Sequence, residues 1–393
     1  MNSAQQNRLF RLLAQPTAPF CEQHVIREIE TQLARTHIPY FADPHGNLVL
    51  GVASKQDYLR RIQLRKREPV RLFIAHMDHP GFHGVRWLSA TRLLVKWHGG
   101  TPVKHVNGRK IWIAAADEQL GCGTLRKAEK HPKYATLRHS EIVFDRVTAA
   151  RLHERAAKRL FGAFDFSKPV WRQGKRLYTR AADDLVGVFN IVETARKLFT
   201  SKTKGDVPFI GLLTRAEEVG FVGAVAHLEL GWLQRASRPL LAVSLEASRN
   251  LPGAVLGKGP VVRLGDRRTV FEANALQVAS ELAERVLPGR HQRRLMDGGA
   301  CEATAAMAWG LPTIGLTLPL GNYHNQGLDG GAQCPKPFGP APEFVHVDDI
   351  DGELKLCRAL MRVGLPWQQP WQGVRKRLQR NQQRHMRLLE QER

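Results

Sequence analysis

The sequence predicts an α/β fold that carries an inserted block of a different, β-rich architecture. Apolar runs of strand length, at residues 70–75 and 207–213, alternate with segments whose apolar side chains recur at helical spacing. From about residue 84 to residue 175 the pattern changes to short segments between glycine-containing turns, which is typical of small antiparallel strands. We therefore expect two architectures within one chain.

The length and composition of the chain fit a large folded protein. Its 393 residues, of which 43% are hydrophobic, can bury a sizeable core and form two units. No apolar run reaches about 18 residues, and the first residues lack the basic and apolar regions of a signal peptide, so we expect a cytoplasmic protein with no membrane partner. The five cysteines are scattered without paired spacing, which argues against a disulfide framework and a structural zinc ribbon.

The chain is strongly basic. It has 59 Lys and Arg residues against 36 Asp and Glu residues, a formal net charge of +23, which favours anionic partners such as nucleic acid. Part of the excess lies at residues 60–67 and 375–393. Because no zinc-finger, RNP-like or homeodomain-like pattern accompanies these residues, we prefer a solvated basic surface to dedicated nucleic-acid recognition.

The first part of the chain predicts helix and strand in turn. Apolar side chains at helical spacing indicate a helix over residues 22–35. Residues 43–47 have the composition of a turn, and a short strand follows at 48–50. The basic residues 54–68 are expected to form a loop or an exposed element before the strand at 70–75.

The α/β pattern returns after the β-rich block, which itself contains a helical piece at 149–160. We expect helices at 183–198, near 222–230, at 271–286 and at about 348–363, and strands at 207–213, 240–246 and 310–316. Residues 325–342 are rich in glycine and proline, so an irregular loop is expected there.

Histidines and carboxylates follow the predicted strands or begin a predicted helix. These residues are His76, Asp78, Asp183, Glu217, Glu218, Glu246 and His324. Imidazole and carboxylate groups are the ligands that suit zinc or a related divalent ion. The set is larger than one tetrahedral ion needs, and two ions that share a bridging carboxylate would use it. A carboxylate such as Glu246 at the end of an apolar strand is also unfavourable to bury unless a cation neutralises it.

Each feature has a plain structural explanation when it is considered alone. Glu217 and Glu218 could be a solvated pair at a turn. His76 could be a satisfied turn histidine beside a capping Asp78, and Asp183 could be the N-cap of its helix. The recurrence of such groups at successive strand and helix ends favours a shared site.

Three motifs resemble those of a known family. They are Ala75-His76-Met77-Asp78-x-x-Gly81-Phe82, Asp183-Asp184-x-x-Gly187 and Glu217-Glu218-Val219-Gly220-x-x-Gly223-Ala224, with an upstream turn at Asp43-x-x-Gly46-Asn47. The sequence resembles the di-metal aminopeptidases that include the tetrahedral and deblocking aminopeptidases, within the clan of co-catalytic zinc exopeptidases. The resemblance covers most of the chain, apart from the basic tail.

The resemblance implies a fold and a domain organisation. The expected fold is α/β, with a mixed central sheet flanked by helices. The catalytic domain would comprise residues 1–82 and 176–365, with a smaller β-rich domain inserted at 83–175 and a basic C-terminal tail at 366–393. Self-assembly into a homo-oligomer is also implied.

The resemblance implies a metal ligand set as well. His76 and Glu246 would bind one ion, and Glu218 and His324 would bind the other. Asp183 would bridge the two ions. Two divalent metal ions are therefore expected, zinc above all, with cobalt or manganese as alternatives.

Three further residues would serve catalysis and substrate binding. Asp78 would orient His76 through the other ring nitrogen. Glu217 would be the general base that takes a proton from a metal-activated water and passes it to the departing amine. Glu302 is assigned to substrate binding, at the amine of the substrate.

The sequence departs from the family pattern at several positions. Glu246 and Glu302 stand where the family has aspartate, and His79-Pro80 replaces an acidic-apolar pair. A glycine- and proline-rich insertion follows His324, which leaves His346 as a rival ligand. We prefer His324 because it follows a predicted strand, whereas His346 begins a helix.

These features predict a metal-dependent hydrolase of peptide or amide bonds, specifically an aminopeptidase that acts on short peptides. Two alternatives are kept. One is a non-catalytic protein that retains the fold and binds nucleic acid or another polyanion through its basic surface. The other is an N-acyl amino acid deacylase, because exopeptidase action rests on the resemblance alone.

Overall fold

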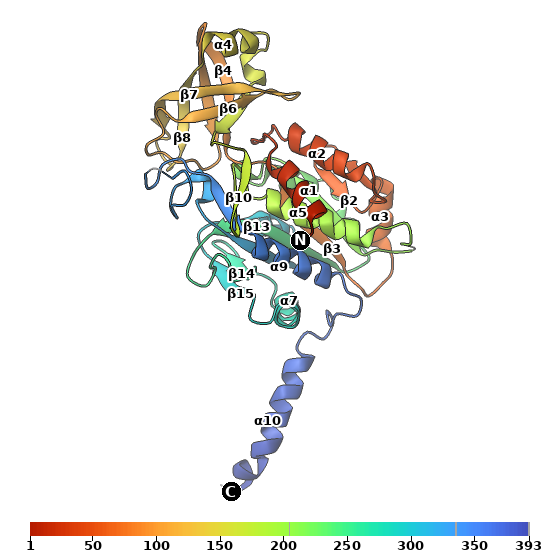
Figure 1. The fold of residues 1–393 in the computed structure, drawn as a ribbon. Coiled ribbons are helices and arrows are strands. Elements are labelled where there is room, and N and C mark those ends of the chain that lie inside the picture. The colour runs from red at the N-terminus through yellow and green to blue at the C-terminus, as the bar shows by residue number, and fades with distance from the viewer. Residues whose placement is uncertain (204, 335, 392–393) are drawn as a thin grey trace.

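The computed structural model describes residues 1–203, 205–334 and 336–391. An eight-stranded mixed sheet with helices on both faces forms its main body, and a separate closed β-barrel lies at one end (Figure 1). The predicted fold class, α/β with an inserted β-rich unit, is therefore confirmed. Within the described residues, no helix is long and apolar enough to cross a membrane.

The central sheet is parallel in its middle, is joined to its outer strands by antiparallel pairs, and ends at one edge in a parallel pair. In sheet order its strands are β1 (Tyr40–Ala42), β2 (Leu48–Leu50), β12 (Phe209–Thr214), β3 (Val70–His76), β13 (Leu240–Arg249), β16 (Thr313–Leu320), β14 (Val261–Asp266) and β15 (Gln292–Met296). Strands β12, β3, β13 and β16 run parallel. Every residue of β3 and β16 is buried, as expected for strands covered on both faces. The carboxyl ends of these parallel strands meet at one edge, where chemistry is commonly placed.

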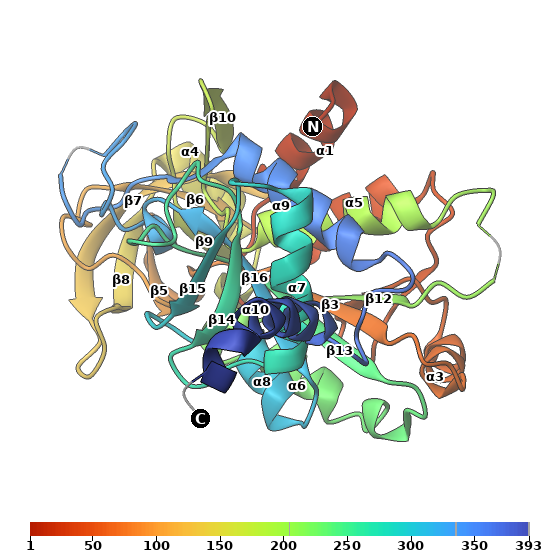
Figure 2. The same ribbon diagram turned by 90° about the horizontal axis from the view of Figure 1, so that it is seen from below.

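Two layers of helices cover the sheet, as the view along α10 in Figure 2 shows. One layer contains α1 (Ser3–Leu13), α2 (Gln23–Leu33), α5 (Leu185–Leu198), α7 (Ala273–Val286) and α9 (Val347–Leu360). The other contains α3 (Lys55–Gln63), α6 (Val222–Leu228), α8 (Glu302–Ala308) and the short helix Leu233–Arg235. The first eleven residues of α5 are all buried, because this helix lies between the sheet and its neighbours α1 and α9.

The barrel has a hydrophobic core of its own. Its strands, in barrel order, are β4 (Gly81–Ser89), β5 (Arg92–His98), β8 (Leu137–Val143), β7 (Gln119–Lys130), β6 (Lys110–Ala114) and β9 (Phe161–Phe164). Helix α4 (Arg146–His153) and the short helix Ala157–Arg159 lie between β8 and β9 in the chain, so the predicted helical piece at 149–160 is shorter and begins earlier.

A three-stranded sheet lies outside both units. It consists of β10 (Val170–Gln173), β11 (Arg176–Thr179) and β17 (Glu343–His346). β10 belongs to the predicted insert, yet it pairs with β11 rather than with a barrel strand. The domain boundaries at residues 83 and 175 stay a prediction.

Other elements differ from the sequence predictions, and β1, β14, β15 and α8 were not predicted. The exposed element expected at 54–68 contains helix α3, in which Tyr58 and Ile62 are fully buried. β13 continues three residues past Glu246, so this carboxylate lies within the strand rather than at its end. Helix α1 was not predicted at all.

The basic tail forms one long helix, α10 (Gln372–Gln391), which extends away from the body on the side opposite the barrel (Figure 1). Residues 392–393 of the tail lie outside the described part of the chain, as does Pro335 in the irregular loop at 325–342.

Candidate metal centre

His76 ends β3 with its ring held in one orientation. Its Nδ1 donates a hydrogen bond to the backbone carbonyl of Asp78 at 3.0 Å. The opposite nitrogen, Nε2, lies 3.4 Å from Oδ1 of Asp183 and 3.7 Å from Oε1 of Glu246. A histidine whose Nδ1 is engaged in this way presents Nε2 as a metal ligand.

Asp183 is shared by two groups of candidate ligands. Its second oxygen, Oδ2, lies 3.5 Å from Nε2 of His324, and that nitrogen is 3.0 Å from Oε1 of Glu218. The two groups are His76, Asp183 and Glu246 on one side and Asp183, Glu218 and His324 on the other, and the ligand atoms within each group lie within 4.8 Å of one another. This is the arrangement that a carboxylate bridging two ions requires. His76, Glu217 and Glu218 form a further candidate group, which does not contain Asp183.

Asp184, not Asp183, caps helix α5. The side chain of Asp184 accepts a hydrogen bond from the backbone N–H of Gly187 at 3.2 Å. The plain N-cap explanation of Asp183 is therefore wrong, and both oxygens of Asp183 are left for the ligand groups.

Several polar atoms of the cluster have no hydrogen-bond partner among the described residues. They are Oδ1 of Asp183, Oε1 of Glu218 and Nε2 of His324, all buried. Burial of unpaired carboxylates is strongly unfavourable unless cations neutralise them. The donor set of imidazole and carboxylate groups therefore fits zinc or a related divalent cation on each side of Asp183.

The crowding of charged groups shifts the pKa values in the cluster. Burial, followed by the neighbouring carboxylate of Asp183, raises the pKa of Glu246 to about 8. Burial would also raise the pKa of Asp183, but the neighbouring imidazole groups of His324 and His76 hold it well below its usual range. Burial would lower the pKa of His324, whereas Glu218 and Asp183 raise it to about 10. The carboxylates thus create a field that favours bound positive charge.

The turn after β12 carries Glu217 and Glu218 in the short helix Glu217–Val219. The carboxylate of Asp78 accepts the backbone N–H groups of both residues, at 2.9 and 3.2 Å. The predicted contact of this carboxylate with Nδ1 of His76 is not formed as a hydrogen bond, because the nearest oxygen lies 3.7 Å away. Asp78 instead connects His76, through its carbonyl group, to the glutamate pair.

Glu22 supports the same turn. Ala216 has a φ of 52°, a left-handed conformation that is uncommon for a residue with a side chain. Glu22 is fully buried and accepts hydrogen bonds from the N–H of Ala216 at 3.0 Å and from Nε of Arg215 at 2.8 Å. Glu22 was not predicted as a site residue, because no local pattern marks a contact across 194 residues.

The upstream turn at residues 43–47 completes this support. Oδ1 of Asn47 accepts the N–H of Arg215 at 3.1 Å, and its Nδ2 donates to the carbonyl of Gly223 at 3.0 Å. Nδ1 of the buried His227 lies 2.9 Å from the Asp43 carboxylate, which also accepts from Asn47. The motif that resembles the family's upstream turn therefore contacts the glutamate turn directly.

Glu343 of β17 orients ligands on the other side of the cluster. Its Oε2 accepts the N–H groups of Ala182 at 2.6 Å and Asp183 at 3.2 Å. Its Oε1 accepts the N–H of His324 at 2.8 Å and lies 3.1 Å from Nε2 of His79. One buried carboxylate thus fixes both Asp183 and His324, a role that the sequence analysis did not assign.

Two other candidates lie apart from the ligand groups. Glu302 is buried, accepts a hydrogen bond from Oγ1 of Thr214, and has its pKa raised to about 7 by burial. It does not line the cleft described below, and its assignment to substrate binding stays a prediction. His346 caps α9 by accepting the N–H of Asp348 at 3.3 Å and belongs to neither ligand group of the described residues.

The cluster opens into a cleft of about 710 Å³. Its lining includes Asp183, Glu217, Glu218 and Glu246, together with Tyr323 of the short helix Tyr323–Asn325 and the loop residues Arg267 and Arg268. The candidate metal ligands are therefore accessible to a molecule of peptide size.

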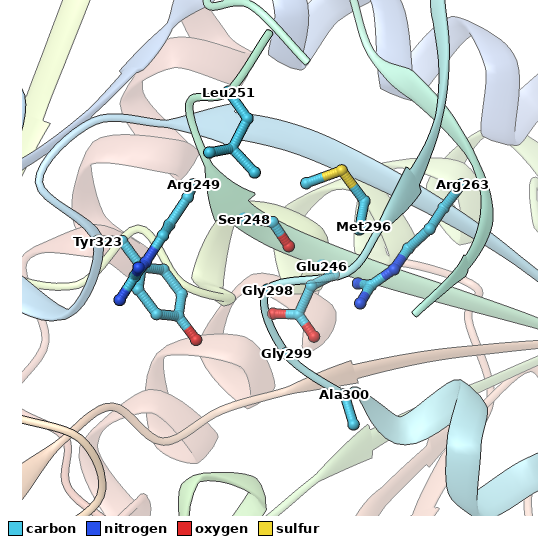
Figure 3. A pocket seen from close by; sticks show the side chains of 10 residues that line it. All are labelled: Glu246, Ser248, Arg249, Leu251, Arg263, Met296, Gly298, Gly299, Ala300 and Tyr323. Carbon is cyan, nitrogen blue, oxygen red and sulfur yellow. The ribbon is translucent and has the colours of Figure 1, made fainter. Parts of the chain in front are cut away.

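A side pocket adjoins the cleft and shares Glu246 and Tyr323 with it (Figure 3). Arg263 and Arg249 both line this pocket, and Arg249 lies over the ring of Tyr323 at 5.4 Å. Arg263 is only 2% exposed, and its Nη1 has no hydrogen-bond partner among the described residues. Neither arginine was predicted as a site residue, because nothing distinguishes them from the other basic residues in the sequence.

Comparison with protein-family models matches residues 60–327 to the family described as M42 glutamyl aminopeptidase. The matched span is more than half of the chain and contains every candidate metal ligand. Comparison with curated proteins gives no match.

Solved structures share the fold across nearly the whole chain. The Pyrococcus horikoshii TET1 peptidase, described as able to assemble into a tetrahedron or a large octahedral shell, is 21% identical, covers 91% of this chain and 99% of its own, and has a TM-score of 0.68. The TET aminopeptidase of a marine sediment Thaumarchaeota archaeon is 17% identical, covers 93% of this chain and 99% of its own, and has a TM-score of 0.71. Aminopeptidase APDkam598 of Desulfurococcus kamchatkensis is 19% identical, covers 93% of this chain and 97% of its own, and has a TM-score of 0.69.

Proposed function

The chain belongs to the M42 glutamyl aminopeptidase family and is a metal-dependent aminopeptidase, and we propose that it removes acidic residues from the N-termini of short peptides. The observation that carries this substrate class is the buried guanidinium of Arg263 beside the candidate metal centre, whose Nη1 has no hydrogen-bond partner among the described residues. The neighbouring structures support the fold, whereas the substrate preference rests on residues of this chain.

Two divalent cations fit the centre. His76 and Glu246 would hold one cation, Glu218 and His324 would hold the other, and Asp183 would contact both. Zinc suits this set of imidazole and carboxylate ligands, with cobalt or manganese as alternatives. When bound, such cations lower the pKa of water and polarise the scissile carbonyl group.

Glu217 is the proposed general base. Its carboxylate lines the cleft and lies 3.9 Å from Nε2 of His76, whereas Glu218 lies 3.0 Å from its histidine, His324. Burial, reinforced by the carboxylates of Glu246 and Glu218, raises the pKa of Glu217 well above its ordinary value. A carboxylate of raised pKa is a stronger base, suited to take a proton from the attacking water and to deliver it to the departing amine.

The side pocket supports the proposed preference for an acidic residue. Glu246 lines both the cleft and the pocket, so a residue bound at the metal centre can direct its side chain into the pocket. Leu251 and Met296 offer apolar contacts to methylene groups, and Arg263 offers a free donor to a carboxylate. A charged donor in a buried site binds a planar carboxylate strongly.

The proposal is tested with glutamyl, aspartyl, leucyl and lysyl 4-nitroanilides and with N-acetylglutamate. We expect the glutamyl or aspartyl substrate to have the highest kcat/KM and N-acetylglutamate to be unreactive. Arg263→Met should lower kcat/KM for the glutamyl substrate by about 10- to 100-fold, the worth of hydrogen bonds between charged groups, and change the leucyl value by less than about threefold. Arg293→Met, an exposed position on β15, is the control and should change neither value.

Other results would contradict the proposal. A wild-type preference for leucyl or lysyl substrates would remove the acidic specificity while leaving the aminopeptidase activity in place. Hydrolysis of N-acetylglutamate alone would favour the deacylase alternative.

Assembly into a homo-oligomer is also proposed. The Pyrococcus horikoshii TET1 peptidase, which shares this fold, forms a tetrahedron or an octahedral shell. Mass photometry of the purified chain should show a multiple of its 44.2 kDa mass, and a monomer at micromolar concentration would contradict the proposal.

A further inference from the structure

We propose that the segment from residue 365 to the end of α10 binds single-stranded nucleic acid, with tryptophan rings that stack on bases and a row of basic side chains that contacts phosphates. The site lies at the base of α10 and shares no residue with the candidate metal centre. The inference does not depend on the proposed peptide specificity.

A groove of about 630 Å³ lies at the base of α10. Two tryptophans, Trp367 and Trp371, and two basic residues, Arg375 and Lys376, line it together with glutamine amides. Trp371 is 44% exposed, and its Nε1 donates a hydrogen bond to Asn274 at 2.8 Å, which holds the ring in place. Aromatic rings beside basic side chains are the combination that proteins use to bind single strands without sequence preference.

A second hollow of about 320 Å³ extends this groove towards the body of the protein. It shares Trp367 with the first groove and reaches Arg67, in the basic segment that follows α3. The guanidinium of Arg71 lies 6.0 Å from the ring of Trp367. Arg67, the last residue of the basic segment at 60–67, and the basic tail thus meet around one tryptophan, with Glu68 also in the lining.

One face of α10 continues the positive charge beyond the groove. Lys376, Arg380, Arg384 and Arg387 recur at spacings of three and four residues, so they lie on one side of the helix. This row is about 16 Å long at the rise of an α-helix. All four side chains are exposed, and none has an acidic partner among the described residues. Arginines so spaced match the repeated phosphates of a nucleic-acid backbone.

The composition of α10 argues against two other occupants. Its apolar side chains are Val374, Leu378, Met386, Leu388 and Leu389, but Asn381, Gln382 and His385 separate Leu378 from the last three, so no continuous apolar face is available for a bilayer. A second copy of α10 would bring like charges together, because the helix contains six Lys and Arg residues and one Glu. The formal net charge of +23 on the whole chain attracts a polyanion in addition.

Fluorescence anisotropy of a fluorescein-labelled 20-nucleotide single strand of mixed sequence tests the proposal on the full chain. The helix variant replaces Lys376, Arg380, Arg384 and Arg387 by Ala. The control variant replaces four exposed basic residues of the barrel domain, Arg126, Lys130, Lys133 and Lys158, by Ala and so removes the same charge. We expect the helix variant to bind at least tenfold more weakly, with the slope of log affinity against log salt reduced by about 3 in magnitude, because each phosphate contact on a single strand contributes about 0.7.

The control variant should bind within twofold of wild type, and Trp371→Leu should weaken binding at least threefold. Both four-residue variants should retain wild-type peptidase activity, which shows that they fold. Equal losses in the helix and control variants would assign binding to net charge and overturn the site. Absent binding by the wild type would overturn it too, as would binding of phosphatidylserine vesicles in preference to the oligonucleotide.

Discussion

Replacement of Glu22 tests how the catalytic turn is held. Its carboxylate accepts the N–H of Ala216 and Nε of Arg215, and it is fully buried. Glu22→Ala removes three hydrogen bonds to a charged acceptor, from the N–H groups of Phe20 and Ala216 and from Nε of Arg215, and leaves Arg215 without its buried partner. The free energy of unfolding should therefore fall by about 3 to 5 kcal/mol. The left-handed conformation of Ala216 loses its main support at the same time, and Glu217 should move from its position in the cleft.

The assays are urea unfolding followed by circular dichroism and steady-state kinetics with the glutamyl substrate. A displacement of about 1 Å at a reacting group lowers rates by about 100-fold, so we expect kcat/KM to fall by that factor. Glu28→Ala on helix α2, which follows Glu22, is the control, because Glu28 contacts Arg11 and Gln32 and not the catalytic turn. Its ion pair with Arg11, whose side chain is 56% exposed, is partly solvated and contributes about 1 kcal/mol. If Glu22→Ala stays within threefold of wild type in kcat/KM and is as stable as the control, Glu22 does not hold the turn.

Two further predictions concern packing and buried charge. In Gly223→Ala the added Cβ would lie 2.3 Å from the carbonyl oxygen of Arg215 and 2.5 Å from Oδ1 of Asn47. The free energy of unfolding, measured in urea, should therefore fall by about 2 kcal/mol or more, and peptidase activity should be lost. Wild-type stability and activity would refute the close approach. Burial raises the pKa of Glu353 to about 8, so the folded protein favours the neutral carboxyl group. The stability that this raised pKa provides is fully present below the unfolded pKa of about 4.5 and is lost as the pH rises through about 8. Glu353→Gln should therefore match wild type near pH 4.5 and exceed its free energy of unfolding by about 1 to 3 kcal/mol near pH 9, and a difference independent of pH would refute a neutral Glu353.

The sequence predicts the α/β fold, the β-rich insert and the candidate ligands because these depend on local patterns. A strand of apolar residues that ends at a histidine or a carboxylate is visible in a short window, as at His76 and Glu217. Parallel strands then bring such ends to one edge without any further information. His324 is favoured over His346 by the same local argument, and the structure places His324, and not His346, in a ligand group.

The supporting residues could not be predicted, because their partners lie far away in the sequence. Glu22 contacts Ala216 and Glu343 contacts Ala182, across 194 and 161 residues. The carboxylate of Asp78 accepts a hydrogen bond from the backbone N–H of Glu217, and the spacing of residues in the sequence does not predict this contact. Arg263 differs from the other arginines because it is buried beside Glu246, and the order of charged residues in the sequence does not show this burial.

The central claim is that Glu217 is the general base and Glu218 is a metal ligand. Measuring the metal content and the turnover of variants at both residues tests this claim most directly. Glu217→Gln should keep the divalent metal content of wild type, by inductively coupled plasma mass spectrometry, and lower kcat by at least about 100-fold, the range of general-base catalysis. Glu218→Gln should lose about one cation per chain, because it removes the charge that faces His324 and Asp183. Loss of metal in Glu217→Gln with full occupancy in Glu218→Gln would reverse the assignment and contradict the account.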